Sequence, residues 1–176
     1  MKRSSLFPLP EYFDRYINLC DDVTITEAIE TSISELDENK LSIWKNMGDL
    51  RYVPGKWTIK DILQHLIDTE RIFSYRALAI ARGEQQKLPS FDEDNYALEA
   101  QANLRSVESL VEELKQSHRS LQQMYASFTS EMLERKGMGF KGEYSVASIG
   151  FCMAGHQRWH FQILEERYYP LLKGKQ

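Results

Sequence analysis

The sequence predicts an all-α protein folded as a four-helix bundle. Four long segments carry apolar residues at intervals of three or four, the spacing that places them on one face of a helix. Capping residues, glycine and proline mark the ends of these segments. The connection between the second and third segments is much longer than the others. We therefore expect those two helices to run in the same direction, which gives the bundle an up-down-down-up order.

Composition narrows the class of protein. A chain of 176 residues is long enough for a substantial core, and we expect a single domain over residues 1–176. A net charge of −4 argues against a general nucleic-acid binder, and no apolar run approaches the ~18 residues that would span a membrane. Residues 1–10 lack the apolar segment of a secretory signal, and two cysteines provide no disulfide framework. These features favour a cytoplasmic location.

Residues 1–22 predict an N-terminal arm rather than part of a long helix. Pro8 and Pro10 interrupt the chain early in this stretch. A short helix is expected over residues 11–17, because aromatic residues there share one face. We expect the arm to pack on the bundle.

The first two long helices are defined by their apolar stripes and by the residues at their ends. The first is expected to run without interruption from about Thr26 to Gly48. The second begins after Thr58, which is followed three residues later by Asp61 as in a capping box, and it ends before Gly83. The stripes comprise Ile29, Ile33, Leu36, Leu41 and Trp44 in the first helix, and Ile59, Ile62, Leu63, Leu66, Glu70, Phe73, Ala77 and Ile80 in the second.

The second half of the chain predicts two further long helices. A connection over residues 83–106 comes first, and its acidic cluster is typical of the first turn of a short helix. The third long helix starts after Ser106. Residues 136–144 predict a turn or small hairpin, and the last helix runs from the capping residue Ser145 to Pro170. The stripes comprise Val107, Leu110, Val111, Leu114, Leu121, Met124 and Phe128, then Ile149, Cys152, Met153, His156, His160, Ile163 and Arg167.

Three of the four histidines fall on the predicted inward faces of two helices. His156 and His160 lie one helical turn apart, with Cβ atoms roughly 5–6 Å from each other. Two such imidazoles can chelate one metal ion, and His65 on the second helix would complete an open site of three nitrogens. The alternative is that they are core histidines bonded to neighbouring side chains or water. His118 falls near the stripe of the third helix among charged residues, and we do not expect it to be a ligand.

The residues around these histidines do not identify a single catalytic base. Gln157 stands where the zinc-protease motif HExxH has its glutamate, so that mechanism is absent and Gln157 is expected to matter little. Asp68 and Glu70 follow His65 by about one turn. They are candidates for a base or for an acceptor of a ligand's other ring N–H, although ion pairs with nearby arginines explain them equally well. Cys152 is expected to be a buried thiol rather than a ligand.

Four stretches of the chain, taken together, resemble the DinB/YfiT-like superfamily of metal-binding four-helix bundles. The resemblance covers about residues 5–170. It implies one divalent ion, zinc or nickel before iron or manganese, held by His65, His156 and His160. Where many relatives have a further histidine this chain has Trp159, which would reshape the pocket if its indole points inward. The stretches are KWTIKDILQHLIDTERIFSYR (56–76), LPSFDED (88–94), AGHQRWH (154–160) and EERY (165–168).

The resemblance also implies a function for such a site. The superfamily looks like a scaffold that different members use for thiol-dependent chemistry. The expected activity is therefore transfer of a low-molecular-weight thiol, such as bacillithiol, mycothiol or glutathione, to a small electrophile. In that reaction the metal favours the nucleophilic thiolate. Basic groups for an anionic thiol would come from Arg71, Arg76, Arg158 and Arg167.

Two alternatives stand beside this activity. The protein could be a metal-dependent hydrolase, in which the ion lowers the pKa of a bound water. It could instead be a binding or structural module whose metal only ties the second helix to the fourth. A structural zinc normally has four protein ligands, so three convincing candidates favour an open site. The resemblance is compatible with a homodimer, and neither a nucleic acid nor a membrane is an expected partner.

Overall fold

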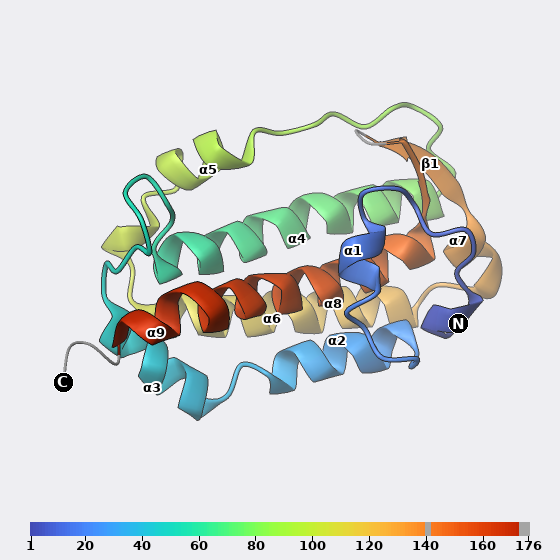
Figure 1. Ribbon diagram of the computed structural model, residues 1–176. Helices are drawn as coiled ribbons and strands as arrows, with labels where there is room; N and C mark the ends of the chain where they lie inside the picture. The colour runs from blue at the N-terminus through green and yellow to red at the C-terminus, as the bar shows by residue number, and fades with distance from the viewer. Residues whose placement is uncertain (140–141, 173–176) are drawn as a thin grey trace.

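The computed structural model describes residues 1–139 and 142–172, and helices dominate it (Figure 1). Four long helices form a bundle, as the sequence predicts, and short helices and one hairpin connect them. The elements are η1 (Arg3–Ser5), α1 (Asp14–Ile17), α2 (Ile25–Ser34), α3 (Glu38–Met47), α4 (Ile59–Ala81), α5 (Glu93–Glu99), η2 (Ala102–Leu104), α6 (Val107–Ala126), α7 (Ser130–Glu134), β1 (Lys136–Gly139), β2 (Gly142–Ser145), α8 (Val146–Ile163), the π-helical turn η3 (Leu164–Tyr168) and α9 (Tyr169–Leu172).

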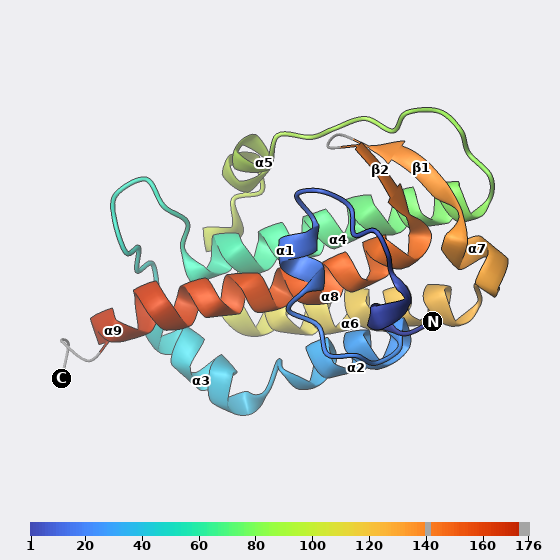
Figure 2. The same cartoon turned by 45° about the vertical axis from the view of Figure 1, so that its right-hand side comes forward.

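The bundle consists of α2, α4, α6 and α8. Helices α6 and α8 each pack against both α2 and α4, so α2 and α4 lie diagonally opposite each other. Figures 1 and 2 both show α8 in front of α6, with α4 above them and α2 below. In the part of the chain that the model describes, no helix is both long and apolar enough to cross a membrane.

Hydrogen bonds near the ends of α4 and α6 fix the relative direction of these two helices. Asn103, just before α6, bonds to Thr58 and Asp61 at the start of α4. Arg135, beyond the end of α6, donates a hydrogen bond to the carbonyl of Ala81 at the end of α4. The two helices therefore run the same way, and the long connection through α5 returns the chain along the bundle (Figure 1).

The first long helix is not continuous, and the prediction of one uninterrupted helix there is wrong. The chain leaves α2 after Ser34 and begins α3 at Glu38. The cause is Asp37, whose backbone is extended and whose side chain accepts a hydrogen bond from the amide of Lys40, 2.8 Å away. This is a new N-cap. Leu36 stays buried beside the break, so the apolar stripe continues although the helix does not.

The predicted starts of the other three helices are confirmed by their caps. Thr58 accepts a hydrogen bond from the amide of Asp61, and the Asp61 carboxylate accepts one from the Thr58 amide, which completes the capping box. The side chains of Ser106 and Ser145 each accept from an amide three residues further on. Gly83 follows the end of α4 with a φ of +93°, a conformation that favours glycine.

The segment that leads into α8 is a two-stranded antiparallel hairpin, in which Lys136 pairs with Ser145 and Gly139 with Gly142. Residues 140–141, which fall within the predicted turn or hairpin, lie outside the described residues. The far end of α8 differs from the prediction that Pro170 stops it. The chain continues through η3 into α9, where Pro170 is the second residue. Proline has no amide to donate, so the run of helical hydrogen bonds loses one bond at this position but does not end there.

The N-terminal arm packs on α8, in agreement with the sequence. Ile17 and Cys20 are buried, and the backbone of Tyr16 lies directly against Gly155. A β-carbon at Gly155 would collide with the carbonyl oxygen of Tyr16, so glycine is what lets α1 approach α8 so closely. The ring of Tyr16 thereby reaches His156.

A polar layer divides the apolar core of the bundle into two clusters. One cluster includes Phe73 and Phe151, and the other includes Leu63 and Phe161. Between them, at the same level, every helix of the bundle contributes polar groups. The layer comprises Ser32 of α2, His65, Thr69 and Glu70 of α4, His118 of α6, and His156, Gln157 and His160 of α8.

Candidate metal centre

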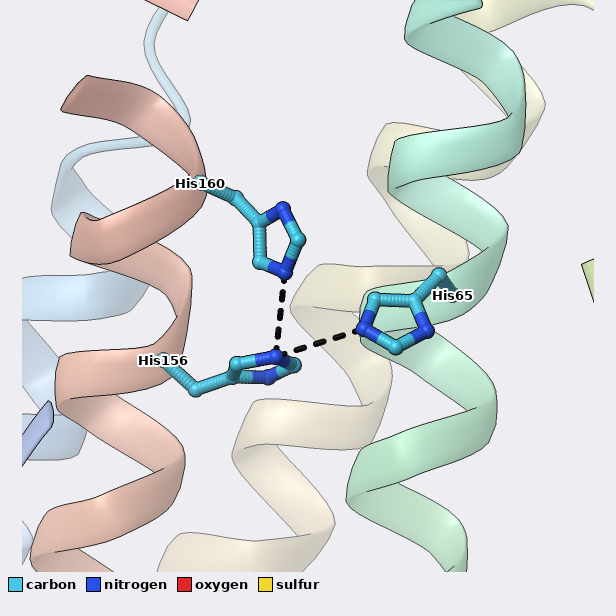
Figure 3. Close-up of side chains that lie close together, drawn as sticks. All are labelled: His65, His156 and His160. Carbon is cyan, nitrogen blue, oxygen red and sulfur yellow. Dashed lines mark hydrogen bonds between the residues drawn. The ribbon is translucent and has the colours of Figure 1, made fainter. Parts of the chain in front are cut away.

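Three histidines converge inside the polar layer, and each presents the same ring nitrogen (Figure 3). The Nε2 atom of His156 lies 3.3 Å from Nε2 of His65 and 3.0 Å from Nε2 of His160. The ligand atoms of all three lie within 4.8 Å of one another. The sequence-predicted candidates are therefore brought together, two from α8 and one from α4.

The helices and two aromatic rings hold these imidazoles in place. His156 and His160 share one face of α8 because they are four residues apart. The indole of Trp57 packs on His65, with ring centroids 4.6 Å apart, and on His160, at 6.3 Å. Tyr16 meets His156 edge-on at 5.1 Å. These contacts restrict the rings to orientations in which the Nε2 atoms face one another.

Burial keeps the three imidazoles neutral at physiological pH. It lowers the pKa of His65 to about 3, helped by the nearby His160, and the pKa of His160 to about 4. The pKa of His156 is also well below its usual value, because of burial and of the two other rings. A neutral imidazole nitrogen is the form that binds metal, so no proton has to be removed from these rings at pH 7.

The spacing of the nitrogens suits a small divalent ion. A tetrahedral ion with metal–nitrogen bonds of about 2.0–2.1 Å holds its ligands roughly 3.3–3.4 Å apart. The two Nε2 separations around His156 are close to this value. Among the described residues, no cysteine or carboxylate joins the three histidines as a fourth donor. The donor set thus fits an ion with an open coordination position.

Thr69 supports His65 from the other side of its ring. Its hydroxyl lies 3.4 Å from Nδ1 of His65, one turn along α4. An acceptor at this nitrogen fixes which ring nitrogen carries the proton and so leaves Nε2 free for a metal. From the sequence, Asp68 and Glu70 were the candidates for this role.

Asp68 and Glu70 do not contact the three candidate ligands. Asp68 accepts a hydrogen bond from Gln64, and the charge of Arg71 lies 3.9 Å from it. Partial burial raises the pKa of Asp68 above its usual value. Glu70 is fully buried and bonds to His118. Neither carboxylate contacts any of the three histidines.

Two clefts open beside the histidine cluster. The first, of about 380 Å³, exposes His65 and His156 and has aromatic walls that include Phe73 and Phe91. The second, of about 730 Å³, exposes His160 and is bordered by Trp57 and polar residues of the crossover. The centre can therefore be reached from two sides.

Glu93 and Asp94, at the start of α5, border both clefts. Partial burial and the charges of Asp94 and Asp92 raise the pKa of Glu93, so it holds a proton more readily than an ordinary carboxyl. These residues belong to the LPSFDED stretch, whose acidic cluster predicted only the start of a short helix. Their distance of about 30 residues from His65 concealed their place at the site.

The other residues considered from the sequence have structural partners. Cys152 borders the first cleft, but burial raises the pKa of its thiol, which disfavours the thiolate. Trp159 packs edge-on against Tyr16 outside the lining of both clefts, so it does not reshape them directly. Of the four arginines only Arg76 borders the first cleft, where it donates to the carbonyl of Pro89.

Gln157 and His118 make buried hydrogen bonds between helices that the sequence did not predict. Both are buried, and Nε2 of His118 lies 2.7 Å from the side-chain oxygen of Gln157. The expectation that Gln157 matters little rested only on its not being glutamate. The side chain in fact connects α8 to α6 and, through the Ser32 carbonyl and Glu35, to α2.

The comparisons with known proteins agree with this architecture. The family model of the DinB superfamily matches residues 28–164. The chain belongs to the DinB superfamily. A relative from Oceanobacillus iheyensis is 25% identical over 138 residues, which cover 78% of this chain and 75% of the relative. Its assignment as a metal-dependent hydrolase is itself provisional.

Two solved structures share the fold of this DinB-superfamily chain. YfiT from Bacillus subtilis, described as a probable metal-dependent hydrolase with an unusual four-helix bundle topology, superposes with a TM-score of 0.69 at 15% identity. The alignment covers 92% of this chain and 88% of YfiT. The mycothiol-dependent maleylpyruvate isomerase gives a TM-score of 0.58, also at 15% identity, over 96% of this chain and 64% of the isomerase.

Proposed function

We propose that this protein is a metal-dependent enzyme that transfers a low-molecular-weight thiol to a small electrophile. His65, His156 and His160 hold one divalent ion, with zinc or nickel before iron or manganese. When bound, such an ion would lower the pKa of a thiol or water that occupies its open position. The solved-structure neighbour that depends on mycothiol supports thiol chemistry on this fold.

The observation that carries the proposal is the pair of clefts on two sides of the histidine cluster. A transferase has to bring two substrates to one centre, whereas a hydrolase needs room for one substrate and a water. The aromatic first cleft suits an apolar electrophile, such as an aryl halide. The second cleft suits the thiol, because its rim carries Arg51 and Lys56, which can pair with carboxylates of the thiol.

Glu93 takes the role of the base in this proposal. It borders both clefts, and its raised pKa lies nearer to neutrality than that of an isolated glutamate. The thiol proton passes to Glu93, and the thiol sulfur forms a bond to the electrophilic carbon. The leaving group, a halide for an aryl halide, departs with the electron pair of the bond that breaks.

Hydrolysis is the second candidate. The relative from Oceanobacillus iheyensis and YfiT are both described as metal-dependent hydrolases, and the same open position would accept a water. Glu93 would then take the proton of that water. The two activities differ in whether a thiol is consumed.

The test compares thiol transfer with hydrolysis on the same preparation. Protein loaded with zinc, nickel or manganese is incubated with bacillithiol, mycothiol or glutathione and 1-chloro-2,4-dinitrobenzene, and the thioether is measured by mass spectrometry. A second incubation contains nitrophenyl acetate without thiol. We expect thioether above the uncatalysed level, at a rate that falls in Glu93→Gln but not in the matched control Glu99→Gln on the same helix. Ester cleavage without any thioether would favour the hydrolase instead.

A further inference from the structure

A chain of three buried polar side chains crosses the bundle beside the histidine cluster. Glu70 of α4, His118 of α6 and Gln157 of α8 are all at most 2% exposed. Nδ1 of His118 lies 2.6 Å from Oε2 of Glu70, and Nε2 of His118 lies 2.7 Å from Oε1 of Gln157. Three of the four bundle helices are joined at one level by two short hydrogen bonds.

The protons in this chain can be placed from its partners. The amide nitrogen of Gln157 donates to the carbonyl oxygen of Ser32 and to the carboxylate of Glu35. The side-chain oxygen of Gln157 must therefore face His118, and because it can only accept, Nε2 of His118 carries a proton. One further proton lies between Nδ1 of His118 and Glu70, so the pair has no net charge wherever that proton resides. Burial lowers and the Glu70 carboxylate raises the pKa of His118, with a net shift upward.

The three residues flank the candidate ligands along the chain. Gln157 follows His156 directly and precedes His160 by three residues, and Glu70 follows Thr69, whose hydroxyl faces His65. The distance between α4 and α8 at this level decides whether the Nε2 atoms of the two helices can meet. That distance is bridged by the side chain of His118, which bonds to both helices.

We propose that the Glu70–His118–Gln157 chain positions the metal ligands by holding α4 and α8 at the spacing that the three-histidine site requires. The inference rests on the proposed metal site. Apolar contacts are not directional and would let one helix slide along the other, whereas short hydrogen bonds in a dry interior fix the register. The chain also costs stability, because Oε1 of Glu70 is buried without a hydrogen-bond partner.

The experiment separates metal affinity from stability. In the triple variant Glu70→Leu/His118→Phe/Gln157→Leu the polar chain is replaced by apolar groups of similar size. Such replacements of buried polar sets are often neutral or stabilising for the fold. We expect an unchanged or higher melting temperature, a zinc affinity lower by about tenfold or more, and an altered visible spectrum of the cobalt(II) form. Zinc affinity is measured by competition with a chromophoric chelator.

Two single variants and one control sharpen the test. Gln157→Met breaks the bond between α6 and α8, together with the bonds of the Gln157 amide to Ser32 and Glu35, and should lower zinc affinity in the same direction. Glu70→Gln keeps the chain, because its amide can donate to Nδ1 of a neutral His118, and should stay within about threefold of the unaltered protein. The matched control is Gln122→Met, since Gln122 also links α6 to α2 but bonds to Thr26 and Glu30 rather than to the Glu70–His118–Gln157 chain. It should leave zinc affinity unchanged.

The outcomes test two separate claims, the positioning role of the Glu70–His118–Gln157 chain and the metal site itself. Unchanged zinc affinity and an unchanged cobalt spectrum in folded triple and Gln157→Met variants would overturn the positioning role while leaving the metal site intact. If the triple variant fails to fold, Gln157→Met and Glu70→Gln still give opposite expectations. Equal zinc affinities in these two variants would overturn the proposal. Failure of the unaltered protein to take up any metal would overturn the proposed metal site itself.

Discussion

At the scale of single residues, the chemistry of the site comes from three imidazole rings that point one nitrogen each at a common place. His156 is central, because its Nε2 faces both other rings. A single ring nitrogen cannot satisfy two neutral acceptors with one proton. A cation shared by all three would satisfy them together, and this is why the cluster is better explained by a metal than by core hydrogen bonding.

The first prediction concerns His160. Replacing it by alanine should lower zinc affinity at least a hundredfold, because two remaining nitrogens make a weak chelate, while the helical content stays that of the unaltered protein. Isothermal titration and circular dichroism measure the two quantities. The matched control is Gln162→Ala, an exposed position two residues further along α8. Loss of the folded bundle in His160→Ala would point to a structural metal instead of an open site.

The second prediction concerns the pH dependence of the metal-free protein. The pKa of His65 is about 3 in the folded chain and about 6.5 in the unfolded chain, so between these values the unfolded state binds more protons. Stability is therefore complete above about pH 6.5 and falls as the pH is lowered, by about 1.4 kcal/mol per pH unit for each such histidine. Chemical denaturation of metal-free protein at pH 7 and pH 5 should show this fall.

The comparison for the pH prediction is His65→Asn, which removes one of the buried titrating rings. Its loss of stability between pH 7 and pH 5 should be smaller than that of the unaltered protein by roughly 2 kcal/mol. Equal losses in the two proteins would mean that His65 is protonated in the folded metal-free state and that its nitrogen is not held ready for a metal.

The sequence predicted the three candidate ligands but not their surroundings. Spacing of four places His156 and His160 together on any helix, and the predicted inward face of the second helix gave His65 as the third nitrogen, a set that the resemblance also implied. The role of His118 depends on how α6 is rotated about its axis, and the charged residues beside it argued only against a role as a metal ligand. The position of Glu93 depends on how the long crossover folds back, which local patterns do not determine.

At the scale of elements, the N-terminal arm and α8 depend on one glycine. The arm carries Tyr16 to His156 because Gly155 lets the two backbones touch. Gly155→Ala should displace the arm and destabilise the protein by roughly 1–3 kcal/mol, since backbone cannot yield as a side chain does. Hydrogen exchange of residues 1–22 and chemical denaturation measure the two effects.

Gly150→Ala is the control for the arm. The added methyl group at this position of α8 meets the side chains of Ile25 and Tyr125, and not the arm. Amide exchange in residues 1–22 should accelerate in Gly155→Ala only. Equal acceleration in both variants would mean that α8 responds as a whole and that Gly155 has no special contact with the arm.

Helix boundaries were predictable where a capping residue marked the start of the helix. Thr58, Ser106 and Ser145 start their helices as expected, because the residue type and the apolar stripe agree. Asp37 is an equally good cap, but Leu36 and Leu41 continue the stripe across it, and periodicity alone gave one helix where there are two. Pro170 had the opposite effect, because it predicted an end at a position where the chain stays helical although proline donates no amide.

At the scale of the whole molecule, the proposed function depends on a layer of buried polar residues between two apolar clusters. Two apolar clusters hold the helices together above and below the layer. The layer contains the histidine cluster and the Glu70–His118–Gln157 chain, and clefts reach it from two sides. The four-helix fold followed from periodicity and one long connection, whereas the layer and the clefts arise only when four helices are placed together.

The central claim is that His65, His156 and His160 bind one divalent ion, and elemental analysis tests it most directly. Untagged protein purified without chelator is measured beside its His65→Ala variant, before and after exposure to zinc, nickel or manganese. We predict about one ion per chain in the unaltered protein and almost none in the variant. No ion in the unaltered protein, and no uptake of any added metal, would contradict the claim and reduce the three histidines to buried core residues.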